Sequence, residues 1–401
     1  MLTMEKNRNE HGPRVLDGVR VLDFTAVIAG SYCTRLMADL GAEVVKIEAP
    51  EGEILRTAGP MRGDVSALFS AVNSGKLCVS MDLKRSEAVD LCKRLLATHD
   101  IVIENYSPGV MRRLGLDYET LKSVNPRLIM CSISGYGQTG PEASRPAYAP
   151  IVQATSGYDF VTQRAQPGHT RPLNMGLPVG DTSASLQAFG AIMAALYYRA
   201  NSGTGQYIDI AMQDTLLATM HKDFQSAFNG EMNDRHYGPL ETRDGFVMVI
   251  PLNQHHFVDL MNCVGRPDLI GDPRFTTTTA RIYNYDFLQD EIESWTRTKT
   301  STEAMEAFEA RRLPCATYRG IGDLDGDPQL VHRGMLTEVN DAAGPLKVPN
   351  SPFLFSDTHA VVGAAVGRIG EHNYDVLSDH LGMTTEEIAA LEKSGVIGPA
   401  P

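Results

Sequence analysis

The first half of the chain alternates short apolar runs with amphipathic stretches, and this pattern constrains the fold more than any other feature. Short apolar runs predict buried strands, and apolar residues at helical spacing predict the helices between them. Because parallel strands need long crossover connections, the alternation predicts an α/β fold with a parallel sheet covered on both faces. The predicted strands are Val19–Phe24, Glu43–Glu48, Leu77–Leu83, Ile101–Glu104, Arg127–Ser132 and Tyr207–Met212, with helices over Ser31–Leu40 and Ser86–Thr98.

Ligands of open parallel sheets bind beyond the carboxyl ends of the strands. Three segments follow predicted strands at that edge: Thr25–Gly30, Asn105–Gly109 and Ser134–Gly140. We therefore expect functional side chains in these three segments.

A length of 401 residues favours two domains. The polar stretch Asn229–Arg243 reads as a linker to a smaller unit. We expect a large domain made of residues 1–228 and 340–401, and a linker with the small domain over residues 229–339. The elements predicted in the small domain are strands at Gly245–Pro251, Cys315–Tyr318 and Met335–Val339, and helices over Gln254–Val264, Thr279–Thr296 and Thr302–Arg312. The capping-box pattern Thr384–Glu387 predicts a last helix that packs back on the large domain.

Composition excludes several classes of protein. A net charge of −13 argues against nucleic acid as the main partner, and no apolar run is long enough to span a membrane. Residues 1–14 mix charges and do not resemble a signal peptide. Scattered cysteines without CxxC pairs predict reduced thiols and a cytoplasmic location; they are Cys33, Cys78, Cys92, Cys131, Cys263 and Cys315.

Common catalytic motifs are missing. The first strand–helix–strand unit has Glu48 at its end, as in a dinucleotide fold, but the turn TAVIAGSYCTR has one glycine instead of G-x-G-x-x-G. There is no Walker A sequence and no G-x-S-x-G elbow. His255 and His256 are adjacent, so they point in different directions on a helix and do not indicate a metal site.

Gly180–Asp181 stands at the start of a long apolar helix pattern. This position predicts that Asp181 is the N-cap, where backbone N–H groups and the helix dipole would keep its carboxylate ionised. A carboxylate held there beside a glycine could act as a nucleophile. The alternative is that Asp181 only caps the helix.

Asn105–Gly109 predicts a phosphate site. Pro108 suits a first helical turn whose N–H groups face an anion, and Arg112 and Arg113 follow. Lys76, Lys84 and Arg85 flank a nearby strand and could add positive charge. The alternative is a solvated charged face.

Several segments in order resemble the family III CoA-transferases, the group of formyl-CoA transferase and carnitine CoA-transferase. They include LDFTAVIAGSYCTRLMADLGAEVVKIE, IENYSPGVMRRLGLDYETLKSVNPRLIMCSISGYGQTGP and GLPVGDTSASLQAFGAIMAAL. Further matching segments are SGTGQYIDIAMQD, GRPDLIGDPRF, DPQLVHRGML and GEHNYDVLSDHLGM. The resemblance covers nearly the whole chain, and so many segments in the right order make it specific.

This resemblance implies a large Rossmann-like domain made from both chain ends, a smaller inserted α/β domain, and an interlocked homodimer. It implies that CoA passes from an acyl-CoA donor to a free carboxylic acid through aspartyl anhydride and aspartyl-CoA thioester intermediates, with Asp181 as the catalytic residue. CoA is then a substrate, and neither a tightly bound cofactor nor a metal is implied. The CoA-binding residues implied are Val27, Ile28, Ala29, Met81, Lys84, Asn105, Tyr106 and Arg113, with Tyr136 on a loop near the active site.

The chain departs from formyl-CoA transferase at several places, among them Ala49 for an arginine of the nucleotide site and Ser134 for a lysine. Ile28 replaces a glutamine that handles the small acid, and Tyr237–Gly245 lacks the glycine-rich lid. These departures favour a bulkier carboxylate or a dicarboxylate, whose second carboxylate could meet Arg62, Arg164, His169 or Arg171. Two alternatives stay open: a racemase or lyase relative with the same CoA site, and a non-catalytic CoA-binding protein. The intact Gly180–Asp181 pair argues against the second.

Overall fold

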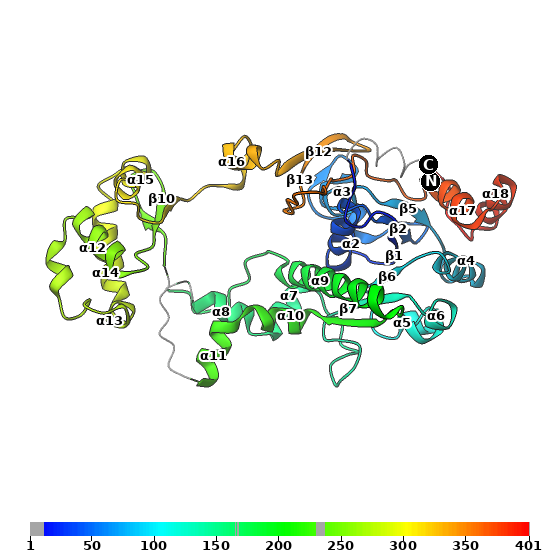
Figure 1. Ribbon diagram of the computed structural model, residues 1–401, viewed down its shortest axis with the longest axis horizontal. Coiled ribbons are helices and arrows are strands. Elements are labelled where there is room, and N and C mark those ends of the chain that lie inside the picture. The colour runs from blue at the N-terminus through cyan, green and yellow to red at the C-terminus, as the bar shows by residue number, and fades with distance from the viewer. Residues whose placement is uncertain (1–11, 165, 167, 230–236, 401) are drawn as a thin grey trace. The chain divides into compact units, whose positions relative to one another are not determined.

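The computed structural model describes residues 12–164, 166, 168–229 and 237–400 (Figure 1). The chain forms two compact units, one with the residues up to His221 and from Val331 onward, the other with Lys222–Leu330. The expected boundaries, 228/229 and 339/340, differ from this division by several residues at each end. Residues 1–11 and the linker residues 230–236 lie outside the described part of the chain.

The large unit contains a parallel sheet with the strand order β5-β2-β1-β6-β7-β8. The predicted α/β class is therefore confirmed. The order runs outward in both directions from the central pair β1 and β6, so the topological switch point lies between these two strands. The strands are β1 (Arg20–Asp23), β2 (Glu43–Glu48), β5 (Leu77–Ser80), β6 (Ile101–Glu104), β7 (Ile129–Ser134) and β8 (Tyr207–Ala211).

Helices cover both faces of this sheet with separate apolar clusters (Figure 1). One face carries α2 (Ala29–Asp39), α7 (Ala149–Thr155), α9 (Val179–Ser202) and α10 (Met212–Thr219). The other carries α4 (Ser86–Leu96), α5 (Val110–Arg113), α6 (Tyr118–Val124), α17 (Asn373–Leu381) and α18 (Thr385–Ser394). The capping box at Thr384 and Glu387 is present, and α18 packs on the large unit as expected.

A third cluster extends the large unit beyond the sheet. Val339 and Val348 pack with Phe69 and Val72, so the hairpin of β12 and β13 belongs to the large unit. The expectation that Met335–Val339 belongs to the small domain differs from this packing. The elements here are η1 (Ile54–Thr57), β3 (Met61–Arg62), β4 (Val65–Ser66), α3 (Ala67–Asn73), β12 (Leu336–Asp341) and β13 (Gly344–Pro349).

The small unit is an α/β body with its own core. An antiparallel sheet has the order β11-β10-β9, and Phe257, Phe275 and Phe308 are fully buried beside it. Its elements are β9 (Leu240–Glu241), β10 (Phe246–Val249), α12 (Gln254–Cys263), η2 (Pro267–Gly271), α13 (Thr278–Tyr283), α14 (Tyr285–Thr296), α15 (Ser301–Glu309), β11 (Cys315–Thr317) and η3 (Ile321–Leu324).

Three more helices lie near the unit boundaries or before α9. They are α8 (Tyr158–Arg164), α11 (His221–Asn229) and α16 (Pro328–His332). The expected single helix over Gln213–Phe228 is thus two helices, α10 and α11, interrupted at Met220. Within the described residues, no helix combines the length and apolar character that crossing a bilayer requires.

Candidate active site

Two of the three predicted loops meet at the switch point of the sheet. The side chain of Asn105, which follows β6, bridges to the loop after β1. Asn105 Oδ1 accepts a hydrogen bond from the Ala26 N–H at 2.8 Å, and Asn105 Nδ2 donates to the Ala26 carbonyl at 2.7 Å. The crevice between the carboxyl ends of β1 and β6 is where ligands of open parallel sheets bind.

The loop after β1 has an unusual backbone. Val27 has a φ of 61°, a left-handed conformation that is strained for a β-branched residue. Its N–H donates to Glu53 Oε2 at 2.7 Å. At Gly30, an added Cβ would lie 2.1 Å from Thr25 Cγ2, so the return of the chain into α2 requires a glycine. Strained backbone that is held this firmly is typical of a functional loop.

A buried ion pair between Asp23 and Lys76 holds the start of the loop after β1. Asp23 accepts from the Thr25 N–H at 2.8 Å and forms an ion pair with Lys76 Nζ at 3.0 Å. Burial alone would raise the pKa of Asp23, but Lys76 and Lys46 hold it well below its ordinary value. Lys76 is only 2% exposed and is paired with Asp23, so it is neither part of a solvated charged face nor a free positive charge for a phosphate.

Asp181 lies in the first turn of α9, but not at its cap. The helix begins at Val179 after Pro178, which makes Asp181 the third helical residue. Among the described residues, no hydrogen bond to its carboxylate is found, and burial raises its pKa to about 6. The predicted N-cap position is therefore wrong, since Pro178 precedes the helix. The pKa is raised because burial outweighs the helix dipole here, although the carboxylate is still mostly ionised at pH 7, as the sequence predicts.

Contacts on either side fix the backbone of Asp181. Ser185 lies one turn further along α9 and is buried. Its hydroxyl donates to the Ala29 carbonyl at 2.6 Å and to the Asp181 carbonyl at 2.8 Å. Gly180 packs against α7, where an added Cβ would lie 3.5 Å from Ala149 Cα. The start of α9 is thus joined to the loop that carries Val27, and the Asp181 side chain stays partly exposed.

The other predicted CoA-binding residues near the strand ends differ in how exposed their side chains are. Ile28 precedes α2 and is partly buried, whereas Ala29 is buried as its first residue. Met81 follows β5 but is fully buried, so its side chain is part of the core. Lys84 is exposed, and Tyr106 packs against the apolar cluster under α4, where burial raises the pKa of its hydroxyl.

Arg113 differs from its neighbour Arg112. Both are exposed on α5, but an added Cβ at Gly109 would lie 3.4 Å from Arg113 Nη1, so the Arg113 guanidinium lies beside the loop after β6. Gly109 caps α5 with a φ of 86°. Pro108 was expected in the first turn of this helix, but it lies before the helix begins.

Tyr136 follows β7, and its hydroxyl lies 3.3 Å from Thr155 Oγ1 of α7. The same helix contacts Gly180, so Tyr136 and Asp181 share α7 as a neighbour. The Arg145 guanidinium lies over the Tyr136 ring at 5.6 Å.

Of the four candidates for a second carboxylate, Arg62 has its partners elsewhere in the large unit. Arg62 donates to Asp341 Oδ2 at 3.0 Å and to the Pro345 carbonyl at 2.7 Å, so it holds the β12–β13 hairpin. Arg164 ends α8, and His169 and Arg171 are exposed in the segment that leads into α9. These last three stay predictions.

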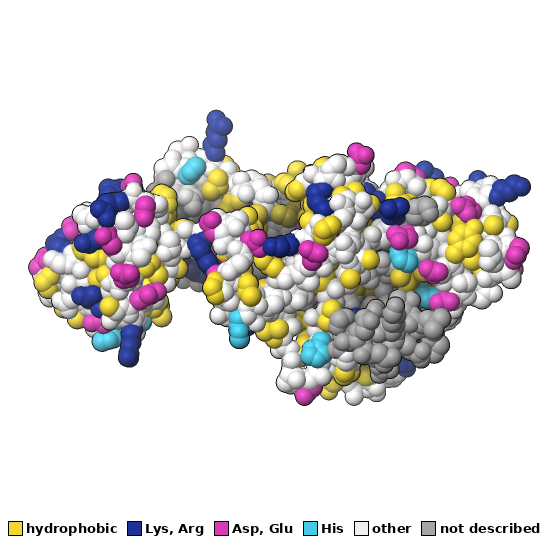
Figure 2. Space-filling view, turned by 90° about the horizontal axis from the view of Figure 1, so that it is seen from above, with side chains coloured by type: hydrophobic (Ala, Val, Ile, Leu, Met, Phe, Trp, Pro, Cys, Tyr) yellow, Lys and Arg dark blue, Asp and Glu magenta, His cyan; other side chains and the backbone are white. Residues whose placement is uncertain are grey.

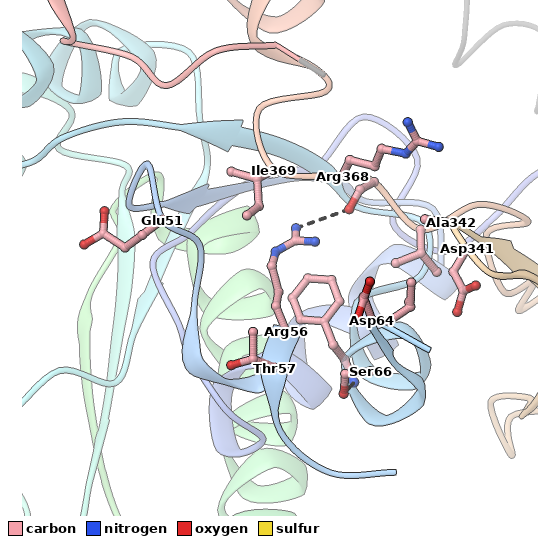
Figure 3. A pocket seen from close by; sticks show the side chains of 13 residues that line it. Glu51, Arg56, Thr57, Asp64, Ser66, Asp341, Ala342, Arg368 and Ile369 are labelled. Atoms are coloured by element: carbon pink, nitrogen blue, oxygen red, sulfur yellow. Dashed lines mark hydrogen bonds between the residues drawn. The ribbon is translucent and has the colours of Figure 1, made fainter. Parts of the chain in front are cut away.

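An open pocket of about 400 Å³ is lined in part by Asp341, the partner of Arg62 (Figure 3). Arg56 crosses it and donates to the Gly367 carbonyl at 3.2 Å, and its charge is neutralised by Glu48 at 2.6 Å. Glu51, Asp64, Asp341 and Arg368 give the wall mixed charge. No residue predicted from the sequence lines this pocket.

The remaining expectations concern thiols, metals and surface charge. Cys33 is buried, and burial raises the pKa of its thiol, as expected for a structural cysteine. The described cysteines form no disulfide, and no group of His, Cys, Asp and Glu suited to a metal occurs in the described part of the chain. Figure 2 shows acidic and basic side chains interspersed over one face.

Comparisons with known proteins agree with the resemblance found in the sequence. The model of CoA-transferase family III matches residues 16–373. Succinyl-CoA:mesaconate CoA-transferase of Haloarcula hispanica is 34% identical, covering 91% of this chain and 96% of the relative. Succinyl-CoA–D-citramalate CoA-transferase of Chloroflexus aurantiacus is 33% identical, covering 97% and 100%. A CAIB/BAIF family protein of Brucella suis superposes with a TM-score of 0.78 at 30% identity, covering 92% and 100%.

Proposed function

Because this chain belongs to CoA-transferase family III and is a CoA-transferase, we propose that Asp181 is the nucleophile that carries the acyl group and then CoA. A carboxylate oxygen of Asp181 attacks the thioester carbonyl of the donor, and the CoA thiolate leaves. The product is a mixed anhydride between Asp181 and the donor acid. The thiolate then attacks the aspartyl carbonyl of this anhydride and releases the donor as a free carboxylate.

The second half of the cycle is the reverse of the first. The acceptor carboxylate attacks the aspartyl-CoA thioester, forms a new anhydride and releases the thiolate. The thiolate attacks the acceptor carbonyl, which yields the new acyl-CoA and restores the Asp181 carboxylate. Anhydride and thioester are both activated acyl groups, so no step needs an external energy source.

One observation carries this proposal: Asp181 is a partly buried carboxylate without a described hydrogen-bond partner, beside the loop at the switch point. A structural carboxylate would be paired or would cap a helix. A carboxylate whose pKa is raised to about 6 is more basic than an ordinary aspartate, yet it is still mostly ionised at pH 7. This combination suits a nucleophile.

The pH dependence of exchange should report this titration. Protonated Asp181 cannot attack, so we expect kcat/KM to fall about tenfold per pH unit below pH 6 and to level off above pH 7. Initial rates at saturating acceptor between pH 4.5 and 8 measure this profile. A plateau that extends unchanged below pH 5 would contradict an Asp181 nucleophile with a raised pKa.

Arg113 should contribute to CoA affinity. We expect Arg113→Ala to weaken CoA binding by about 1–3 kcal/mol, the usual size of a charge-assisted contact with phosphate. Arg112→Ala is the matched control, because this neighbour is equally exposed but has no contact with Gly109. Isothermal titration of both variants with CoA makes the comparison. Equal affinity of the two variants would remove Arg113 from the site.

We infer that the acids exchanged are dicarboxylic. Both relatives described above are named for succinyl-CoA and for a second dicarboxylic acid, mesaconate or D-citramalate. Arg171 and His169 are exposed in the segment that precedes the helix of Asp181. The positive charge of Arg171 is available there for a distal carboxylate. This agrees with the departures from formyl-CoA transferase at Ile28.

A mixture of acyl-CoAs and free acids, read by mass spectrometry in deuterated water, tests the reaction and its substrates together. We expect new CoA esters of C4 and C5 dicarboxylic acids and little CoA transfer to the matching monocarboxylic acids. Transfer to monocarboxylic acids alone would contradict the dicarboxylate assignment. Deuterium at C2 of a recovered acyl-CoA without exchange would instead support the racemase alternative.

We also propose that the protein is a homodimer with interlocked subunits. Helices α7, α8 and α9 and the segments that join them expose large apolar side chains that a partner subunit would cover. These side chains are Tyr148, Ile151, Phe160, Met175, Leu177, Leu186 and Tyr197. Light scattering should give twice the chain mass of 43.7 kDa, and dilution should not dissociate the dimer. A monomer would contradict this proposal.

A further inference from the structure

Glu53 lies just before η1, outside every segment singled out from the sequence, yet it reaches the loop after β1. Its side chain is only 6% exposed. Glu53 Oε2 accepts from the Val27 N–H at 2.7 Å, and Glu53 Oε1 lies 3.3 Å from Lys46 Nζ. The contact with the Val27 N–H is a charge-assisted, directional hydrogen bond, and the contact with Lys46 is an ion pair without hydrogen-bond geometry.

Lys46 extends the same network to the neighbouring residue. Lys46 Nζ donates to the Thr25 carbonyl at 2.6 Å and is fully buried. Although burial disfavours its charge, Asp23, Glu53 and Glu48 raise the pKa of Lys46, so it stays protonated. Glu53 and Lys46 therefore hold two successive parts of the loop from the β2 side, and Asn105 holds Ala26 from the β6 side.

Val27 is the residue that needs this support. With a φ of 61°, it would relax toward an extended or right-handed helical conformation if its N–H lost its acceptor. Relaxation would move Ile28 and Ala29, whose carbonyls lie 3.5 Å and 2.6 Å from Ser185 Oγ on the helix of Asp181. The conformation of Val27 thus determines how the loop faces the proposed nucleophile.

We propose that Glu53 is a positioning residue for CoA transfer, which keeps Val27 in its strained conformation and so aligns the loop of residues 27–29 with Asp181. This proposal rests on the proposed function of Asp181. Glu53 does not touch the reacting atoms; it acts through the backbone of Val27. A misplacement of reacting groups by about 1 Å can lower a rate about a hundredfold, so the loss of this contact should appear in kcat.

The test compares Glu53→Ala, Glu53→Gln and the control Glu51→Ala. Glu51 is an exposed acid two residues away and lies outside the loop contacts. We expect Glu53→Ala to lower kcat per folded active site about 10- to 100-fold and to weaken CoA binding as well, because the displaced residues 27–29 are among the assigned CoA contacts. Glutamine keeps an acceptor oxygen for the Val27 N–H, so Glu53→Gln should recover most of the lost kcat.

A second substitution separates positioning from simple stability. Glycine adopts positive φ without strain, so Val27→Gly in the Glu53→Ala background should restore part of kcat. If Glu53 only stabilised the fold, Glu53→Ala would lower the melting temperature and leave kcat per folded site unchanged, which would overturn the proposal. Failure of Glu53→Gln and of Val27→Gly to restore any kcat would also overturn it.

The wild-type assay distinguishes this proposal from the proposed function. If the wild type exchanges CoA and Glu53→Ala has normal kcat, only the positioning role fails. If Asp181→Ala retains exchange, the proposed function fails whatever Glu53 does.

Discussion

Asp181→Ala should reduce CoA exchange about 10⁴-fold or more, because the variant has no group that can carry the acyl intermediate. CoA affinity should change little, since the assigned CoA contacts belong to the strand-end loops and not to this carboxylate. Exchange of labelled acid into acyl-CoA measures the rate, and calorimetry measures CoA binding.

Gln187→Ala is the matched control for this substitution. Gln187 is exposed on the same helix, and its replacement should leave exchange within about twofold of wild type, as for most surface changes. Wild-type turnover by Asp181→Ala, or an equal loss in both variants, would refute the assigned nucleophile.

Asp181→Ala should also be more stable than the wild type at pH 7. A carboxyl group whose pKa is raised by folding destabilises the native state once the pH exceeds its ordinary pKa. Because Asp181 is partly exposed, we expect a gain of about 1–2 kcal/mol in unfolding free energy, less than the full shift would give. Urea unfolding should show this gain at pH 7 and its disappearance near pH 4. A less stable variant would show that Asp181 has a structural partner.

Lys76→Met should destabilise the large unit by about 3–5 kcal/mol, the usual cost of removing one partner from a buried ion pair. Lys76 Nζ donates to Asp23 at 3.0 Å, to Asn73 Oδ1 at 2.7 Å and to the Ser31 carbonyl at 2.9 Å, and all three acceptors would lose this donor. Thermal unfolding should therefore shift down by about 6–15 °C.

Two further variants test whether the destabilisation by Lys76→Met comes from the buried ion pair. Lys84→Met changes an exposed lysine and should alter stability by less than about 0.5 kcal/mol. Asp23→Asn combined with Lys76→Met should recover part of the loss, because no unpaired carboxylate remains. The effect of Lys76→Met should be large near pH 7 and should shrink as the pH falls, because Asp23 of the variant lacks the charge of Lys76 that keeps its pKa low and becomes protonated in the native state. Equal stability of Lys76→Met and wild type at pH 7 would contradict the buried pair.

The alternation of strands and helices predicted the sheet well, because each strand carries apolar residues that are buried under the helices on either side. The predicted bounds of Glu43–Glu48 and Ile101–Glu104 match β2 and β6. The assignment of Met335–Val339 to the small domain differed from the structure because the pairing of β12 with β13 is a tertiary property, which no local pattern reports.

The site was only partly predictable for the same reason. Asp181 stood out because it begins a long helix, but its actual position depends on Pro178, and its raised pKa depends on burial by distant segments. The sequence around Lys76 is compatible with a surface cation, but in the structure Lys76 is buried against Asp23. Glu53 has no local signal at all, since its role comes from a contact with Val27, 26 residues earlier.

Chemical trapping of the covalent intermediate tests the central claim most directly. Wild-type protein is incubated with an acyl-CoA donor and hydroxylamine, then digested and analysed by mass spectrometry, with Glu51→Ala as a turnover-competent control. An activated acyl group on the side chain reacts with hydroxylamine, so we expect an aspartyl hydroxamate at Asp181 that requires the acyl-CoA. Continued exchange with no modification at Asp181, or with the hydroxamate at another residue, would contradict the account.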